Sequence, residues 1–257
     1  MKENKIFYYK SFKDDFIINK NQEYKLPKDY KWIHNNFFYK MFSSILHKIF
    51  RFMGFIYCKL FLHVKIQNKE VLKKYKKQGY FIYGNHTQPV GDVFIPGLTS
   101  KKRIYTIASP SNMGVSGIGL FLPMLGILPI PEDIGRTKQL LEAVKTRINE
   151  KNAVVIYPEA HVWTYYTKIR PYKSVAFKFP VDTNSICFCI TTTYYKRKYG
   201  KKPGIKVYID GPFKIETTLN KKENQEKLCK DIYECMVRRS ENSNFEYIKY
   251  VDERKIM

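Results

Sequence analysis

The chain has 257 residues, 44% of them hydrophobic and 16% aromatic, a composition that fits a globular protein with one substantial core and excludes a disordered chain. Lys and Arg number 46 against 23 Asp and Glu, and the formal net charge of +23 indicates an anionic partner: nucleic acid, an acidic membrane surface, a phosphorylated substrate or an acidic carrier protein. The five cysteines include no C-x-x-C pair, which argues against a disulfide framework and a zinc site and favours a reducing compartment.

Residues 1–35 have little internal periodicity and are expected to form an N-terminal arm without a secretory signal. Residues 36–63 carry apolar side chains at helical spacing on a broad face, interrupted by Lys, Arg and His. Gly54 is a possible break into two helices. Basic amphipathic helices suit the plane of a membrane interface, and packing into a protein core is the alternative use of the same pattern. We expect this segment to dock the protein on a membrane, because it is dense in Phe and its polar face is basic. No apolar stretch reaches the roughly 20 residues that span a bilayer.

From residue 64 to residue 257, short strand patterns alternate with helical ones. Strands are expected at 63–66, 80–83, 103–108, 153–157, 185–192 and 205–209, and helices at 69–77, from 93, at 137–149, at 174–179 and from Asn220. Residues 117–130 are apolar but broken by Gly and Pro, which suits a buried or lipid-facing wall. The alternation predicts one α/β domain over 64–257, with helices covering its sheet and a helix near its C-terminus.

The segment from Asn85 to Asp92 follows an apolar run that reads as a buried strand ending in a turn. A His at that position is a candidate base, because imidazole titrates near neutral pH and can take a proton from a hydroxyl. A carboxylate on its far ring nitrogen would fix the tautomer, and Asp92 lies six positions after His86. The alternative is a His at a strand end with Asp92 capping the next helix. The sequence has no G-x-S-x-G elbow, which argues against a serine hydrolase.

Charged residues in two later segments are further candidates. Arg136 precedes a predicted helix and could meet an anion near the helix N-terminus, or be a solvated first-turn residue. Glu159 directly follows a buried strand and is expected to organise a loop by accepting hydrogen bonds. Lys168, Arg170 and Lys173 then crowd an aromatic segment, which by itself reads as a solvated basic loop.

The order of these motifs resembles the lysophospholipid acyltransferase family, typified by 1-acylglycerol-3-phosphate acyltransferases. That family shows Asn-His-x4-Asp, a Gly…Arg block, a Pro-Glu-Gly-Thr-Arg block and an apolar strand containing Pro. The matching segments here are Asn85–Asp92, Gly126–Arg136, Tyr157–His161 and Ile186–Thr193. Residues 170–177 are similar to the family's Pro-Phe-Lys-x-Gly-Ala-Phe run, and the resemblance covers roughly residues 36–215.

The chain departs from the family pattern in several places. Five residues, not four, separate His86 from Asp92, so the intervening loop must absorb one extra residue. Ala160 and His161 replace the family's Gly-Thr, Val162 replaces its Arg, and the fourth block lacks its Pro. If that Arg normally helps to hold the acceptor's phosphate, a neighbouring basic residue substitutes for it, or the acceptor is not lysophosphatidic acid.

The resemblance implies an α/β fold with a mixed sheet flanked by helices, and an O-acyltransferase of phospholipid synthesis. A fatty acyl group would pass from a thioester to the hydroxyl of a lysophospholipid, with His86 as the base, Asp92 as its orienter, and backbone donors near His86 stabilising the oxyanion. The substrate-binding residues would be Asn85, Arg136, Glu159, His161, Lys168 and Lys173. No metal or cofactor is expected, since acyl-CoA or acyl-carrier protein is a co-substrate. The expected location is the cytoplasmic face of a membrane, peripheral or monotopic, on an anionic surface.

Two other functions fit parts of the sequence. The basic and aromatic clusters at 73–77 and 195–202 are of the kind that track phosphates in nucleic-acid-binding proteins, although no recognisable module for that task is present. A non-catalytic lipid-binding relative fits the altered motifs, but the presence of both His86 and Asp92 argues against it.

Overall fold

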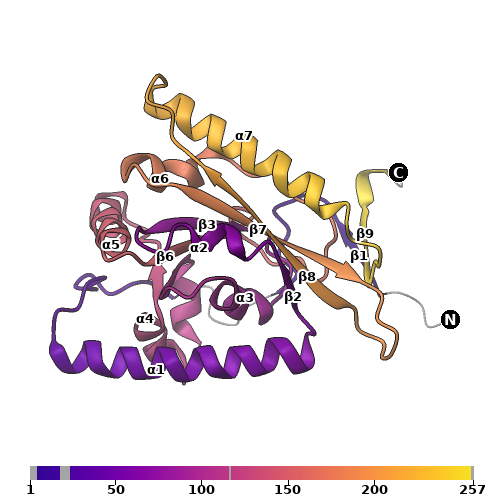
Figure 1. Ribbon diagram of the computed structural model, residues 1–257, viewed down its shortest axis with the longest axis horizontal. Helices are drawn as coiled ribbons and strands as arrows, with labels where there is room; N and C mark the ends of the chain where they lie inside the picture. The colour runs from indigo at the N-terminus through magenta and orange to yellow at the C-terminus, as the bar shows by residue number, and fades with distance from the viewer. Residues whose placement is uncertain (1–4, 18–23, 116, 256–257) are drawn as a thin grey trace.

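The computed structural model describes residues 5–17, 24–115 and 117–255. Residues 1–4 and 18–23 of the predicted arm lie outside the described residues, as do 116 and 256–257. The centre of the structure is a seven-stranded sheet with the strand order β2-β8-β7-β3-β6-β4-β5 (Figure 1). The strands are β2 (Lys65–Gln67), β3 (Tyr80–Gly84), β4 (Ile104–Ala108), β5 (Ile127–Pro129), β6 (Ala153–Ile156), β7 (Cys187–Tyr195) and β8 (Gly204–Phe213). Only β7 and β8 pair antiparallel within this sheet, which confirms the predicted mixed sheet.

Two hydrophobic cores cover the two faces of the sheet, because successive side chains of a strand point to opposite faces. On one face, Phe81 and Tyr83 pack with α5 (Thr137–Asn149), α6 (Lys178–Asp182) and α7 (Lys221–Ser240). On the other, Tyr80 and Ile82 pack with the π-helical segment η1 (Tyr57–Phe61), α2 (Glu70–Lys73) and α3 (Gly91–Thr99). The predicted sheet with helices on both faces is therefore confirmed, as Figure 1 shows with α7 above the sheet and α1 below it.

Helix α1 (Phe37–Ile56) runs without interruption into η1, so the possible break at Gly54 is not present. Gly54 is buried against α3, and a Cβ atom there would lie 2.3 Å from Cδ1 of Phe94. The glycine therefore serves the close approach of two helices instead of a bend. Helix α1 also contacts the short α4 (Leu122–Leu125), where the Ser43 hydroxyl donates to the Met124 carbonyl at 2.6 Å. None of the helices in the described ranges combines the length and the hydropathy that crossing a membrane requires.

Helix boundaries follow the sequence pattern where the capping residues are clear. Helix α5 has the predicted bounds, and Asn220 and Glu223 form the expected capping box of α7. Helix α2 is shorter than predicted and ends at Lys73. Like charges at i,i+3 and i,i+4 destabilise a helix, and Lys residues are dense from 73 to 77. Residues 117–130 divide into η3 (Gly119–Phe121), α4 and β5 instead of forming one element.

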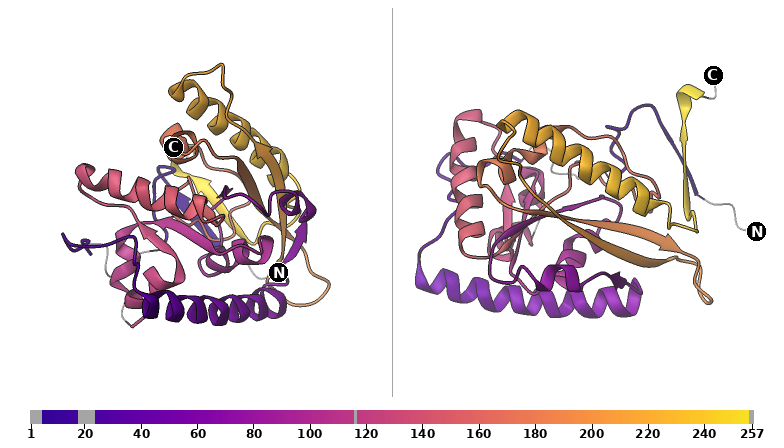
Figure 2. Two further views of the ribbon diagram at one scale, coloured as in Figure 1. Left: turned by 60° about the vertical axis from the view of Figure 1, so that its left-hand side comes forward. Right: turned by 45° about the horizontal axis from the view of Figure 1, so that its top comes forward.

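A second, two-stranded sheet joins distant parts of the chain. Strand β1 (Lys5–Tyr9), within the predicted arm, pairs in parallel with β9 (Ile248–Asp252). Figure 2 shows this sheet at the edge of the molecule. Tyr9 and Tyr250 pack around Trp163, whose side chain is fully buried. The sequence does not predict these two strands, because five residues without clear alternation carry only a weak strand signal.

Candidate active site

The segment between β3 and α3 brings His86 and Asp92 together. Nδ1 of His86 lies 2.8 Å from Oδ2 of Asp92, and the same carboxylate oxygen accepts hydrogen bonds from the backbone N–H groups of Thr87 and Gln88, both at 2.9 Å. Asp92 is the second residue of α3, and Val90 precedes the helix as its N-cap. The extra residue is thus absorbed in the turn before α3, and the carboxylate binds the loop as well as the imidazole.

The surroundings of His86 fix its ring and leave one nitrogen for chemistry. A carboxylate can only accept, so Nδ1 carries the proton and Nε2 has the free lone pair. The ring stacks on Tyr157, with centroids 4.5 Å apart and planes at 17°, and its side chain is 20% exposed. Burial raises the pKa of Tyr157 well above its ordinary value, so its hydroxyl stays protonated and donates to the Asp92 carbonyl at 2.6 Å. These contacts give His86 the tautomer that a general base requires.

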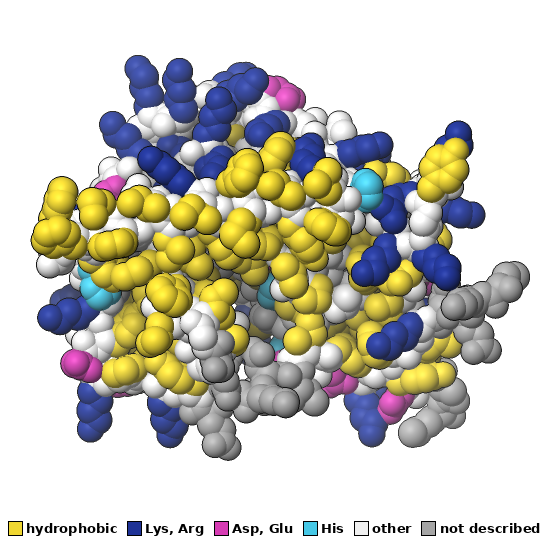
Figure 3. All heavy atoms as spheres, turned by 90° about the horizontal axis from the view of Figure 1, so that it is seen from below, with side chains coloured by type: hydrophobic (Ala, Val, Ile, Leu, Met, Phe, Trp, Pro, Cys, Tyr) yellow, Lys and Arg dark blue, Asp and Glu magenta, His cyan; other side chains and the backbone are white. Residues whose placement is uncertain are grey.

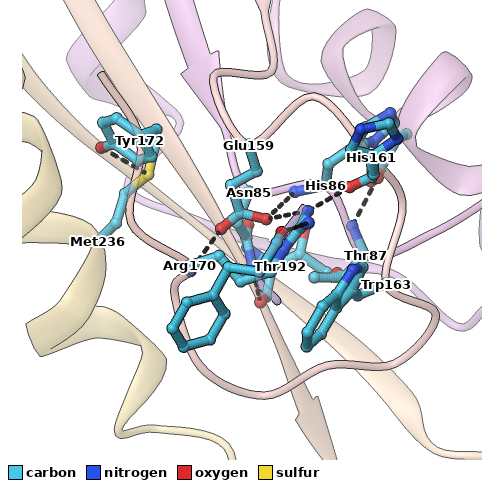
Figure 4. A network of polar contacts seen from close by, with 12 residues as sticks. Asn85, His86, Thr87, Glu159, His161, Trp163, Arg170, Tyr172, Thr192 and Met236 are labelled. Atoms are coloured by element: carbon cyan, nitrogen blue, oxygen red, sulfur yellow. Dashed lines mark hydrogen bonds and ion pairs between the residues drawn. The ribbon is translucent and has the colours of Figure 1, made fainter. Parts of the chain in front are cut away.

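Glu159 lies behind the His86 loop in a fully buried ion pair. Its carboxylate accepts from the His86 backbone N–H at 3.2 Å, from the Arg170 backbone N–H at 3.1 Å and from the Arg170 guanidinium at 2.9 Å (Figure 4). Arg170 also donates to the carbonyls of Phe12 and His161. Burial raises the pKa of Glu159, and Arg170 counters part of that rise. Glu159 therefore organises the loop by accepting hydrogen bonds, as expected, and the predicted direct contact with substrate is wrong because its oxygens are enclosed.

Asn85 is also occupied by the protein itself. Its side-chain Nδ2 donates to the Thr192 carbonyl at 3.0 Å, and its Oδ1 accepts the Thr192 backbone N–H at 2.8 Å. The residue is 1% exposed. Both halves of the amide are therefore used to tie the end of β3 to β7, and its predicted role in substrate binding is wrong.

The backbone N–H groups next to the candidate base are already bonded. Those of His86, Thr87 and Gln88 donate to the carboxylates of Glu159 and Asp92. The expectation that donors of this turn stabilise an oxyanion is therefore wrong for these three groups, because each has a charged acceptor within the protein.

Arg136 holds the N-terminal arm. Its guanidinium donates to the carbonyls of Pro27 at 2.9 Å and Tyr30 at 3.1 Å, and it lies over the ring of Trp32 at 4.9 Å. Trp32 belongs to the core on the α5 and α7 face of the sheet. Two of the five N–H donors of the guanidinium therefore hold the arm, and the role of Arg136 in binding the polar head stays a prediction.

The other predicted binding residues lie in the loop after β6. His161 is partly exposed, with Nδ1 3.2 Å from Oδ2 of Asp15, which orients its ring. Lys168 and Lys173 are exposed. These three remain candidates, whereas Arg170 in the same segment is fully buried, which corrects its interpretation as part of a solvated basic loop.

Three residues that complete the site were not among the predicted site residues. Tyr157 stacks on the candidate base, Arg170 pairs with Glu159, and Trp163 donates its backbone N–H to the His86 carbonyl at 3.0 Å. The one signal for Tyr157 is its place at the end of a buried strand, beside Pro158 and Glu159. For Arg170 the pattern carried no sign of burial.

Two cavities lie next to α3 and the turn that precedes it. One, of about 390 Å³, lies beside the turn before α3 and is lined by Tyr57, Phe61, Leu62, Gln88, Pro89, Val90, Thr164, Tyr165 and Lys202. The other is a smaller, mostly apolar cavity between α1, α3 and α4, with Leu122, Leu125 and Ile127 of the predicted apolar wall in its lining.

A cluster of Cys189, Cys235 and Asp210 is the one group within the described residues whose geometry could suit a metal ion. The two thiols are 3.8 Å apart, but both carboxylate oxygens of Asp210 accept from Arg239, at 2.8 and 2.6 Å. The donor set does not fit a zinc ion well, because the carboxylate is taken and a guanidinium lies beside the thiols.

A polarised imidazole at the carboxyl end of a central strand defines an enzyme-like site for acid–base chemistry. Residues 63–190 match the family model described as Acyltransferase, and the chain belongs to this acyltransferase family. Its fold is similar to the crystal structure of the 1-acyl-sn-glycerophosphate (LPA) acyltransferase PlsC from Thermotoga maritima, with 15% identity, a TM-score of 0.57, and coverage of 82% of this chain and 83% of that one. No curated protein matches the sequence significantly. The resemblance to lysophospholipid acyltransferases is thereby confirmed.

Proposed function

We propose that this acyltransferase moves a fatty acyl group from a thioester donor to the hydroxyl of a lysophospholipid, with 1-acylglycerol-3-phosphate as the first acceptor to test. The observation that carries the proposal is the 2.8 Å contact between His86 Nδ1 and Asp92 Oδ2. It leaves Nε2 of a partly exposed imidazole as the base, and the His–Asp arrangement is one that activates a hydroxyl group.

The reaction needs no acyl-enzyme intermediate. Nε2 of His86 takes the proton of the acceptor hydroxyl as its oxygen attacks the thioester carbonyl carbon. The negative charge of Asp92 stabilises the imidazolium that forms. When the tetrahedral adduct collapses, the C–S bond breaks and the imidazolium returns the proton to the leaving thiolate. The hydrogen bonds from Thr87 and Gln88 to Asp92 hold the carboxylate in place throughout.

We infer the acceptor and the donor from the positive charge of the chain and from its structural similarity to PlsC. PlsC is named as a 1-acyl-sn-glycerophosphate acyltransferase, which supports a phosphate-bearing acceptor here. Lys168, Lys173 and His161 are the basic residues near the Glu159 loop that remain accessible to such a headgroup. The donor is acyl-CoA or acyl-carrier protein, both anionic partners for a strongly basic chain.

Docking on the cytoplasmic face of a membrane, as a peripheral or monotopic protein, is the second part of the proposal. Large apolar side chains of α1 and η1 are exposed, including Phe37 at 72%, Phe52 at 65% and Phe61 at 67%. Figure 3 shows them as a continuous yellow band along the lower face, with a hollow beside it in which His side chains are visible. An exposed apolar face of this size favours burial in an interface. Lys40, Lys48 and Lys59 are exposed on the same segment and suit anionic headgroups.

The competing functions predict different behaviour. A nucleic-acid-binding protein has no use for an exposed Phe-rich helix, and a non-catalytic lipid-binding protein has none for an oriented imidazole. The test is a panel of lysophospholipid acceptors with acyl-CoA and acyl-carrier-protein donors, in wild type and His86→Ala. Acyl transfer should vanish in the variant while its circular dichroism is unchanged. Activity that persists in His86→Ala would refute the assigned base, and tight DNA binding without flotation on anionic liposomes would refute membrane docking.

A further inference from the structure

The loop that joins β7 to β8 concentrates positive charge and has no place in the proposed reaction. Residues 196–202 read Lys-Arg-Lys-Tyr-Gly-Lys-Lys and contain no acidic residue. Lys196, Lys198, Lys201 and Lys202 are exposed, and Tyr199 is 76% exposed. Like charges this close repel one another, so a loop of this composition is stabilised when it meets an anionic surface.

Contacts at the base of this basic loop hold it in one shape. Nε of Arg197 donates to the Lys202 carbonyl at 2.8 Å and closes the turn, in which Gly200 has a φ of +86°. The Tyr195 hydroxyl donates to the His63 carbonyl at 3.4 Å, just after η1, and Nζ of Lys65 lies 4.9 Å from the Tyr195 ring. The basic loop is therefore attached to the segment that follows α1 and η1.

The basic loop lies next to the end of the apolar band. Lys202 lines the same 390 Å³ cavity as Phe61 and Leu62 of the η1 region. Figures 1 and 2 agree in placing the β7–β8 turn beside the C-terminal end of α1, and Figure 3 shows Lys and Arg side chains gathered at that end of the yellow band. Exposed apolar and basic side chains thus share one face.

We propose that the basic loop, residues 196–202, binds the headgroups of an anionic lipid surface and forms a second contact beside α1. The proposal rests on the docking proposed above for α1 and η1. Its lysines reach the phosphates while their alkyl stems and the ring of Tyr199 lie at the level of the headgroups. A nucleic acid would satisfy the charge of the basic loop but leave the adjacent Phe-rich helix in water, which is why a lipid surface is favoured over it.

This arrangement would also orient the candidate site. The cavity that Lys202 lines is bordered by Gln88, Pro89 and Val90, which follow His86 directly in the chain. With α1 on one side and the basic loop on the other, the mouth of this cavity faces the lipid surface. An anionic lysophospholipid then enters beside Lys202, on the path to the imidazole.

The experiment compares binding to vesicles of phosphatidylcholine with and without phosphatidylglycerol, at low and high salt. Neutralising the exposed charges in Lys198→Gln/Lys201→Gln/Lys202→Gln should weaken binding to anionic vesicles by about 10- to 100-fold, and leave binding to neutral vesicles unchanged. The control Lys222→Gln/Lys230→Gln removes exposed charges from α7, on the far side of the sheet, and should weaken binding to anionic vesicles far less. Equal losses in the two sets would mean a general charge effect and would overturn the proposal.

A fluorescent reporter separates the basic loop from α1. Trp32 and Trp163 are 6% and 0% exposed, so Tyr199→Trp adds the one tryptophan that a lipid surface can reach. Its emission should shift to the blue with anionic vesicles and stay unchanged with neutral ones. Phe42→Glu/Phe52→Glu, on the apolar band, should abolish binding to both kinds of vesicle.

The outcomes distinguish this inference from the function it rests on. If wild type binds vesicles and the reporter does not shift, the role of the basic loop is refuted while docking through α1 stands. If the wild-type protein binds neither kind of vesicle, the role of the basic loop and docking through α1 are both refuted, while acyl transfer is tested separately by the His86→Ala assay. If single-stranded DNA shifts the reporter and vesicles do not, the basic loop is a nucleic-acid contact and the proposal is overturned.

Discussion

Replacing Asp92 with Asn removes the negative charge from an oxygen that accepts one imidazole N–H and two backbone N–H groups, at 2.8, 2.9 and 2.9 Å. The Oδ1 atom of Asn, placed where Oδ2 of Asp92 lies, can keep all three bonds, and its NH₂ group takes the place of the other carboxylate oxygen. The Nδ1 proton is then held by a neutral amide, so the imidazolium that forms when Nε2 takes the hydroxyl proton loses the negative charge that stabilises it.

The expected loss in kcat is about 10²- to 10³-fold, which corresponds to roughly 2.7–4 kcal/mol of transition-state stabilisation. KM should change little, because Asp92 is 3% exposed and does not reach the substrate. Folding stability should fall by only about 1–3 kcal/mol, since the three hydrogen bonds survive with a neutral acceptor. The kinetic loss therefore exceeds what a loosened loop explains.

The assay follows thiol release from acyl-CoA, or from acyl-carrier protein, in the presence of the acceptor. The control is Asp133→Asn, because Asp133 also accepts a backbone N–H, that of Gly135 at 2.8 Å, without a histidine partner. If His86 and Asp92 act as a unit, His86→Ala/Asp92→Asn should be no slower than His86→Ala alone. Additive losses in the double variant, or more than a tenth of wild-type activity in Asp92→Asn, would refute the reasoning.

Three further predictions concern stability, measured by chemical denaturation. Glu159→Gln should cost about 3–5 kcal/mol because it leaves Arg170 buried and unpaired, and Glu159→Gln/Arg170→Met should recover most of that loss; no recovery would contradict the pairing. Burial, with Arg103 and Arg51 nearby, lowers the pKa of His47 to about 4, so the unfolded chain takes up its proton first and stability should fall as the pH drops from about 6.5 to about 4, a slope that His47→Gln should flatten. Gly54→Ala should cost about 1–2 kcal/mol through its contact with Phe94, whereas Gly97→Ala, with open space around it, should stabilise by up to about 1 kcal/mol.

Much of the fold could be predicted because its elements carry local signals. The buried strands around Phe81 and Val154 are short apolar runs bounded by turns, and α5 and α7 have clear apolar stripes and caps. The pairing of β1 with β9 could not be predicted, because it depends on residues about 240 positions apart with no pattern of their own. Strand order likewise depends on contacts that no window of sequence contains.

The part of the candidate site that could be predicted is the contact between His86 and Asp92, whose side chains suit acid–base chemistry and lie close together in the sequence. His86 and Asp92 meet as expected, since a strand end and the first turn of the next helix place them within reach. The predicted substrate-binding residues were less accurate, because the sequence does not show which group a polar or charged side chain will contact. Asn85 is satisfied by backbone groups of β7, Glu159 by backbone groups and the Arg170 guanidinium, and Arg136 donates to two backbone carbonyls of the arm, partners that only the fold brings to them.

The parallel pairing of β1 with β9 has a consequence for the order in which the chain folds. Strand β1 cannot pair until β9, about 240 residues later in the chain, has been synthesised, and contacts this distant in sequence form slowly. Trp163 and Tyr250 stack 5.0 Å apart, so the outer wall of the loop that bonds His86 is completed last. The main sheet, which contains none of these residues, can form first. During biosynthesis the loop around Trp163, which bonds the His86 carbonyl, would therefore acquire its final support only after β9 emerges, and the candidate site would be completed later than the main sheet.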